Sequence, residues 1–189
     1  MKSVLKGRKL IYSISFVLLL FMLVFALLSL ASNKMIFKLM YVKLHKVSLP
    51  EFVISVKDGS DFFSKIELSD YNLIIHYDSL ACNECHVNYI SRLDTLFKMA
   101  DDREDFNIIV LFSPKEEKAM ELVSYLKDKS IGYKLYVDIY NKFDIRNGFL
   151  PNEECFHHLL INRNNFPIMV GNPVSNVSMW NLFCRNISI

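Results

Sequence analysis

The sequence feature that most constrains the fold is a pair of cysteines, Cys82 and Cys85, between an apolar run and a helical pattern. Residues 71–79 are rich in β-branched and aromatic side chains and end in turn formers, which predicts a buried strand. After the pair, apolar residues recur at helical spacing up to the polar stretch 101–105: Ile90, Leu93, Phe97 and Ala100. The chain therefore predicts a strand, a Cys-x-x-Cys turn and a helix in direct succession.

The cysteine spacing alone does not define the chemistry. Cys-x-x-Cys serves thiol exchange and zinc ligation equally well, and two nearby cysteines can also be ordinary buried side chains. With Cys155 and Cys184 the chain has 4 cysteines, too few for a disulfide scaffold in a domain of this size. In an oxidising compartment a close pair forms a disulfide unless something keeps it reduced.

The same alternation of elements continues toward the C-terminus. Residues 106–112 predict a second buried strand, and Ser113, Pro114 and Glu116 form the pattern of a capping box that opens a helix over 114–129. Four apolar side chains of that helix are expected in the core: Ala119, Leu122, Val123 and Leu126.

The C-terminal part predicts one more strand, a hairpin and a closing helix. The strand is expected over 133–139, and residues 141–154 form an irregular or partly helical connection. Residues 156–162 and 166–171 predict an antiparallel hairpin, and 175–185 the last helix. This order predicts the fold class α/β, a sandwich of helices on a mixed sheet.

The N-terminal part carries a long uncharged segment. No residue from 10 to 32 is charged, and a helix of that length spans a hydrocarbon core of roughly 30 Å, so we predict a transmembrane helix. A cleaved signal peptide is the alternative, since Ser29 and Ala31 fit a small-x-small cleavage site. The basic head, residues 1–9, predicts a cytoplasmic N-terminus with the remainder outside.

These boundaries divide the chain into four parts. After the head and the membrane helix, residues 33–48 read as a juxtamembrane linker, or as a basic segment on lipid headgroups, and 49–189 as the folded domain. The chain has a net charge of +2 and the head holds four basic residues, so the rest is mildly acidic. Such a domain lacks the positive surface of a nucleic-acid binder, and we expect no nucleic-acid partner.

The order of elements, with Cys-x-x-Cys at the start of the first long helix, resembles the thioredoxin fold. It is particularly similar to the membrane-anchored, periplasm-facing thiol-disulfide oxidoreductases of the TlpA/ResA kind. The stretch from Leu49 through Cys85 looks like that family's N-terminal part, and residues 133–173 like its later strand, helix and hairpin. The closing "GNP" segment also resembles small anchored redoxin-like proteins of Bacteroidetes.

This resemblance implies a site and a mechanism. Cys82, at the helix N-terminus, would be the nucleophile, because free backbone N–H groups and the helix dipole stabilise its thiolate, and Cys85 would resolve the mixed disulfide. Protein thiols and disulfides would be the substrates and a membrane dithiol donor the partner. No cofactor is needed, since the cysteines carry the electrons. The domain would face the periplasm from the inner membrane.

The sequence departs from the family at several positions. Asn83 and Glu84 stand between the cysteines, and a carboxylate there opposes thiolate formation. The family's cis-proline, which faces the disulfide in a substrate loop, aligns with Phe156, next to Cys155, whereas the nearest proline is Pro151. Recognition of the substrate backbone is therefore expected to differ.

His76 is a candidate proton relay. It lies six residues before Cys82 on the predicted strand, where thioredoxins carry a buried acid that moves protons for the second cysteine. An imidazole does this near neutral pH. A core histidine bonded to a backbone carbonyl is the equal alternative.

Two other functions remain open from the sequence. Cys82, Cys85, Cys155 and His157, with His86 or His158, could form a copper or zinc site, although one of two adjacent strand histidines must face away from the other. The cysteine pair could also be a static disulfide in an interaction module. Cys184, near Trp180 and Phe183, is expected in the core.

Overall fold

The computed structural model describes residues 16–24, 34–78 and 90–188. The chain divides into two units, residues 1–41 and 42–189. In the first unit, residues 16–24 and 34–41 are helical. The predicted transmembrane helix, residues 10–32, falls largely outside the described ranges. Within those ranges, no helix combines the length and the apolar character needed to cross a membrane.

The second unit is built on a seven-stranded mixed sheet with the order β2-β1-β5-β4-β3-β6-β7. Its centre is parallel and consists of β3 (Tyr71–Tyr77), β4 (Phe106–Phe112) and β5 (Leu135–Val137). On one side, β6 (His158–Asn162) pairs antiparallel with β3, and β7 (Pro167–Val170) pairs antiparallel with β6. The predicted hairpin and the predicted strand over 106–112 are confirmed, whereas the third strand is shorter than expected.

The other edge of the sheet is a hairpin that the sequence reasoning missed. β1 (Val53–Lys57) pairs antiparallel with both β5 and β2 (Ser60–Ser64). The turn consists of Asp58 and Gly59, with φ of 49° and 76°. An Asp-Gly turn with positive φ at both residues is a strong hairpin signal, so the pattern was present in the sequence.

Three helices cover one face of the sheet. They are α3 (Asp94–Asp101), α4 (Ala119–Asp128) and α6 (Val177–Asn186), and their apolar side chains join those of the strands in one core. The four predicted core residues of α4 are buried, as expected from their spacing. The connections β3-α3-β4 and β4-α4-β5 are crossovers between adjacent parallel strands, which place both helices on the same face when they share one hand.

The predicted capping box is wrong. The helix is preceded by a 3-10 turn, η2 (Glu116–Lys118), and Lys115 precedes that turn without a capping side-chain hydrogen bond. Ser113 is instead fully buried, and its hydroxyl lies 3.2 Å from Nε2 of His76. Ser113 contacts His76 instead of capping the helix, because Ser113 directly follows β4 and His76 lies near the end of the neighbouring strand β3.

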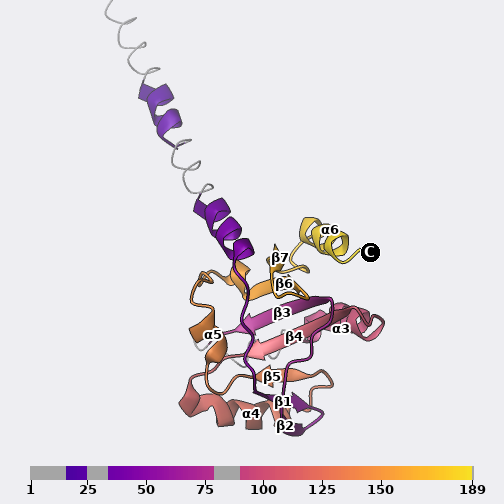
Figure 1. Ribbon diagram of the computed structural model, residues 1–189. Helices are drawn as coiled ribbons and strands as arrows, with labels where there is room; N and C mark the ends of the chain where they lie inside the picture. Colours follow the sequence, from indigo (N-terminus) through magenta and orange to yellow (C-terminus); the bar gives the residue numbers. More distant parts are fainter. Residues whose placement is uncertain (1–15, 25–33, 79–89, 189) are drawn as a thin grey trace, which may run out of the picture. The chain divides into compact units, whose positions relative to one another are not determined.

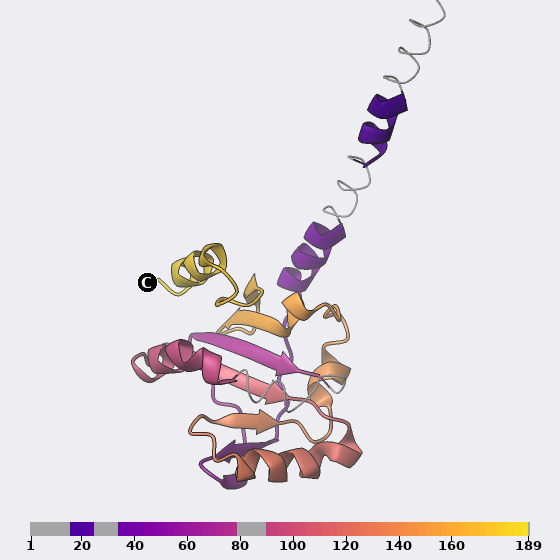
Figure 2. The same cartoon turned by 180° about the vertical axis from the view of Figure 1, so that it is seen from behind.

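The opposite face carries a shorter covering layer. The connection from β5 to β6 contains α5 (Lys142–Arg146) and η3 (Glu154–His157), as the partly helical prediction allowed. In both Figure 1 and Figure 2 the arrowheads of β3 and β4 point toward the end where α5 lies, while α3 lies at the other end. Residues 34–44 are helical, so the predicted linker 33–48 is partly a helix, and Val42 and Val47 are fully buried.

Candidate functional site

Polar side chains gather where β3, β4 and β5 end. His76 is the sixth residue of β3, and Asp78, Ser113 and Asp138 each follow the last residue of a strand. Since parallel strands present their carboxyl ends at one edge of a sheet, this edge is the usual place for a binding site in an α/β fold. The parallel order of β3, β4 and β5 therefore brings these residues together at one edge.

His76 lies at the centre of this group. Its side chain is 6% exposed, and Nε2 is 3.1 Å from Oδ1 of Asp144 and 3.2 Å from Oγ of Ser113. The ring of Phe143 packs against the imidazole with 4.5 Å between the centroids. The imidazole of His76 is therefore held by a carboxylate and a hydroxyl, and neither of these two contacts is to a backbone carbonyl.

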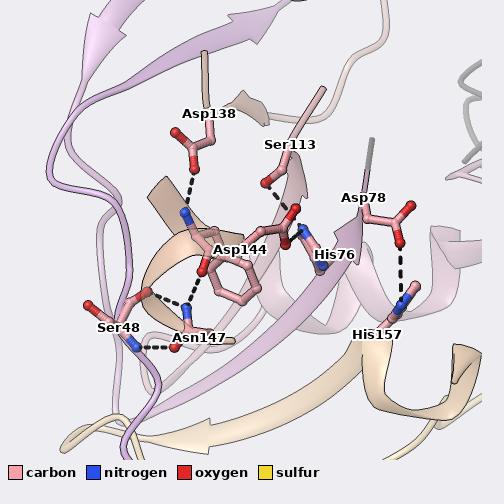
Figure 3. Close-up of polar contacts among 9 residues, drawn as sticks. Ser48, His76, Asp78, Ser113, Asp138, Asp144, Asn147 and His157 are labelled. Atoms are coloured by element: carbon pink, nitrogen blue, oxygen red, sulfur yellow. Dashed lines mark hydrogen bonds and ion pairs between the residues drawn. The ribbon is translucent and has the colours of Figure 1, made fainter. Parts of the chain in front are cut away.

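The helix that carries Asp144 is fixed at both ends (Figure 3). At its start, the backbone N–H of Phe143 donates to Oδ2 of the fully buried Asp138 at 2.7 Å. At its end, Asn147 donates to the carbonyl oxygens of Phe143 and Ser48, and accepts from the N–H of Ser48. These bonds hold α5 in one place against the sheet, and with it the carboxylate of Asp144.

A second histidine lies beside the first. His157 of η3 has its ring centroid 5.8 Å from that of His76, and its Nε2 is 3.9 Å from Oδ2 of Asp78. Burial, followed by the charge of His76, lowers the pKa of His157 below its ordinary value of 6.5, against the opposing effect of Asp78, Asp144 and Glu154. Burial therefore favours the neutral form of His157 over the charged form.

These residues surround a cavity of about 230 Å³. Its lining combines polar and apolar residues: His76, Asp78, Asp144, Asn147, Gly148, Leu150, Pro151, Asn152, Phe156 and His157. Phe156, the predicted substrate-loop residue, is buried there, and Pro151 lines the same space. The described residues contain no cis peptide bond.

The contacts of His76 differ from those of a catalytic triad. In a Ser-His-Asp triad the serine and the carboxylate contact opposite nitrogens of the imidazole. Here Ser113 and Asp144 contact the same nitrogen, Nε2, so the hydroxyl is not activated by a base that the carboxylate supports.

The remaining residues that the sequence predicted for the site are not brought together by the described part of the structure. Cys82 and Cys85, with Ala81, Asn83, Glu84 and His86, lie outside the described residues. Cys155 is exposed, and Cys184 is partly buried against the core, as its sequence context predicted. His158 is paired with Ile75 in the sheet, so it faces the side opposite to His76, and only His157 of the two adjacent histidines lines the cavity.

No group of three metal-ligating residues is formed within the described ranges. The predicted metal site drew two ligands from Cys82 and Cys85, which lie outside those ranges, so it stays a prediction.

Four residues of the site were missed by the sequence reasoning: Asp78, Ser113, Asp144 and Asn147. Asp78 and Ser113 could have been found, because each directly follows a predicted parallel strand. Nothing in the sequence pointed to Asp144 or Asn147, since their role depends on how the β5–β6 connection folds back.

Comparison with known proteins gave no protein family and no curated protein that matches the chain. Several solved structures are similar to it, two of them at 10% and 12% sequence identity. One is an uncharacterized thioredoxin-like protein from Porphyromonas gingivalis, with a TM-score of 0.46 and 10% identity over 76% of this chain and 92% of that chain. The other is Mycobacterium tuberculosis AhpC, with a TM-score of 0.45 and 12% identity over 76% and 92% of the two chains.

The fold assignment is carried by the chain's own topology. A parallel β3-α3-β4 unit is followed by α5 on the opposite face, the β6–β7 hairpin and the closing helix α6. The fold is thioredoxin-like. The additional strands β1, β2 and β5 extend the sheet on the side of β4.

Proposed function

We propose that the chain is a thiol-disulfide oxidoreductase in which Cys82 attacks and Cys85 resolves. In this proposal residues 10–32 anchor it in the inner membrane, the domain faces the periplasm, and a membrane dithiol donor recharges it, as in the TlpA/ResA kind of protein. The substrates are disulfides of extracytoplasmic proteins.

One observation carries this proposal: a buried histidine lines a cavity on the strand that leads directly to the cysteine pair. Cys82 follows Asp78, which lines the same cavity, by four residues. The strand that carries His76 thus immediately precedes the cysteine pair in the sequence, as the proposal requires.

The reaction needs two exchange steps. The thiolate of Cys82 attacks one sulfur of a substrate disulfide, forms a mixed disulfide and releases the first substrate thiolate. His76 accepts the proton of the Cys85 thiol, and the Cys85 thiolate then attacks the sulfur of Cys82. The second substrate thiolate leaves and takes up a proton. The substrate gains two electrons, and the enzyme's dithiol becomes a disulfide.

The reduction potential of the Cys82–Cys85 pair tests the proposal. It is measured on the full chain in detergent by titration with glutathione or dithiothreitol, followed by alkylation of the free thiols. Because Cys155 and Cys184 also react with the alkylating reagent, the Cys155→Ser/Cys184→Ser variant is titrated in parallel. An exchange enzyme has a reversible potential between roughly −270 and −120 mV. A pair that resists reduction below about −300 mV is a structural disulfide, and that result would reject the proposal.

A further inference from the structure

We propose that Asp144 is a positioning residue that fixes the neutral tautomer of His76, holding the proton on Nε2 and leaving Nδ1 as the basic nitrogen. This inference deepens the proposed function, because it identifies the nitrogen of His76 that would accept the proton of the resolving cysteine. It concerns a residue that the sequence pattern did not single out.

The first step of the argument is the chemistry of the contact. Oδ1 of Asp144 lies 3.1 Å from Nε2 of His76, and an ionised carboxylate only accepts hydrogen bonds. Nε2 must therefore carry the proton for the contact to be favourable. In a neutral imidazole the other nitrogen, Nδ1, then holds the lone pair.

The second step is that no other neighbour among the residues that the structure describes makes this choice. Ser113 contacts the same nitrogen at 3.2 Å, but a hydroxyl donates or accepts, so it fits either tautomer. The further polar neighbours in the described ranges are His157 of η3, with its ring 5.8 Å from that of His76, and Asp78 after β3, whose carboxylate lies near His157. Phe143 contributes an apolar ring face only.

The third step is the rigidity of the support. Asp144 lies in the first turn of α5, where the N–H of Phe143 donates to Asp138, and the last residue of the helix is followed by Asn147, which is bonded to Ser48. A carboxylate held in this way orients the ring as well as its proton, as carboxylates do for metal-bound histidines. Loss of such a supporting group costs about 10- to 100-fold in function at sites of that type.

The test measures the tautomer directly, without substrate. The full chain is labelled with ¹⁵N-histidine, and the two imidazole nitrogens of His76 are identified by their absence in the His76→Phe variant. The wild type is expected to show a protonated Nε2 and an unprotonated Nδ1. Asp144→Ala should give a mixture of tautomers, and so should Asp144→Asn, because an amide presents either its oxygen or its NH₂ group to Nε2 and therefore fits both tautomers.

Ser113→Ala is the matched control, since it removes the other contact to the same nitrogen. It should keep the wild-type tautomer. The resolution step, followed by stopped-flow, should slow about tenfold in both Asp144→Ala and Asp144→Asn, and keep the wild-type rate in Ser113→Ala. An unchanged tautomer in Asp144→Ala, or a mixture in Ser113→Ala alone, would overturn the assignment.

Failure of this inference is distinguishable from failure of the proposed function. The tautomer is a property of the protein without substrate, so it does not depend on disulfide exchange. If the reduction potential rejects an exchange enzyme, the nitrogen spectra still show whether Asp144 sets the tautomer. If the potential fits an exchange enzyme and the spectra do not change in Asp144→Ala, only the positioning role is lost.

Discussion

Asn147 and Ser48 are 99 residues apart in the chain and exchange two hydrogen bonds: Ser48 N–H donates to Oδ1 at 2.7 Å, and Nδ2 donates to the Ser48 carbonyl at 2.8 Å. Asn147 follows α5, and Ser48 precedes β1. The pair therefore ties the segment before the first strand to the helix that carries Asp144, so residues before 49 belong to the folded unit. Val42, which precedes the expected domain boundary at Leu49, already lies in this unit.

Asn147→Ala should lower the free energy of unfolding by about 1–3 kcal/mol. Asn147 is 2% exposed, and its loss leaves the N–H and carbonyl of Ser48 without these partners, which is costly in a buried place. Urea unfolding of the variant measures the change. Asn186→Ala removes one exposed bond, to the carbonyl of Leu182, and should change stability by less than about 0.5 kcal/mol. Equal losses in both variants would contradict the role of Asn147.

Asp138→Ala should destabilise the domain by about 0.5–2 kcal/mol, because its carboxylate accepts from the N–H of Phe143 in the first turn of α5. The effect should reach the site, since α5 carries Asp144. The ¹⁵N spectrum of His76 in this variant reports that displacement, and urea unfolding reports stability. A variant with full stability and an unchanged spectrum would show that the cap does not support α5.

His76→Phe should slow resolution of the mixed disulfide by roughly 10²- to 10⁴-fold, the usual contribution of a general base, without unfolding the domain. Stopped-flow measurement of the second exchange step checks this. The matched control is His158→Phe, because His158 is equally buried but faces the other side of β3. If His76→Phe showed the same exchange kinetics as the wild type, the role of His76 as a proton relay would be contradicted.

Cys85→Ser should trap a covalent complex with substrate proteins, and Cys82→Ser should not. In the first variant the nucleophile still forms the mixed disulfide, but the resolving thiolate is missing. Non-reducing electrophoresis of the two variants after incubation with an oxidised protein shows the complex. Trapping by Cys82→Ser instead would reverse the assigned roles, and trapping by neither would argue for a static disulfide.

Tyr136 should make the domain less stable at high pH. Burial, followed by the charge of Glu67, raises the pKa of Tyr136 from 10.0 to about 12. The unfolded chain releases the phenolic proton near pH 10 whereas the folded chain holds it, so this contribution is complete below pH 10 and is lost as pH rises toward 12. The shift corresponds to about 2–3 kcal/mol.

The difference between wild type and Tyr136→Phe isolates that contribution. Urea unfolding at several pH values should give parallel curves below pH 10, and a steeper loss of stability for the wild type between pH 10 and 12. Curves that stay parallel over the whole range would show that the phenol titrates alike in the folded and unfolded chains.

Much of the fold was predictable because its signals are local. The strands over 71–77 and 106–112, the core side chains of α4 and the closing hairpin follow from apolar runs, helical spacing and turn residues. Ser113 shows the limit of such reasoning. Its position in the sequence predicted a helix cap. In the structure its hydroxyl instead contacts the imidazole of His76 on the neighbouring strand, in a buried place.

The candidate site was likewise predictable from the sequence only in part. The sequence by itself determined that a cysteine pair follows a buried strand carrying His76, because both depend on residue order and period alone. Only the tertiary structure decided that Asp144, Asn147 and His157 meet at that strand's end, and that His158 does not. The physical reason is that side chains far apart in sequence become neighbours only when sheet register and a crossover connection fix their positions, and neither is encoded in a local pattern.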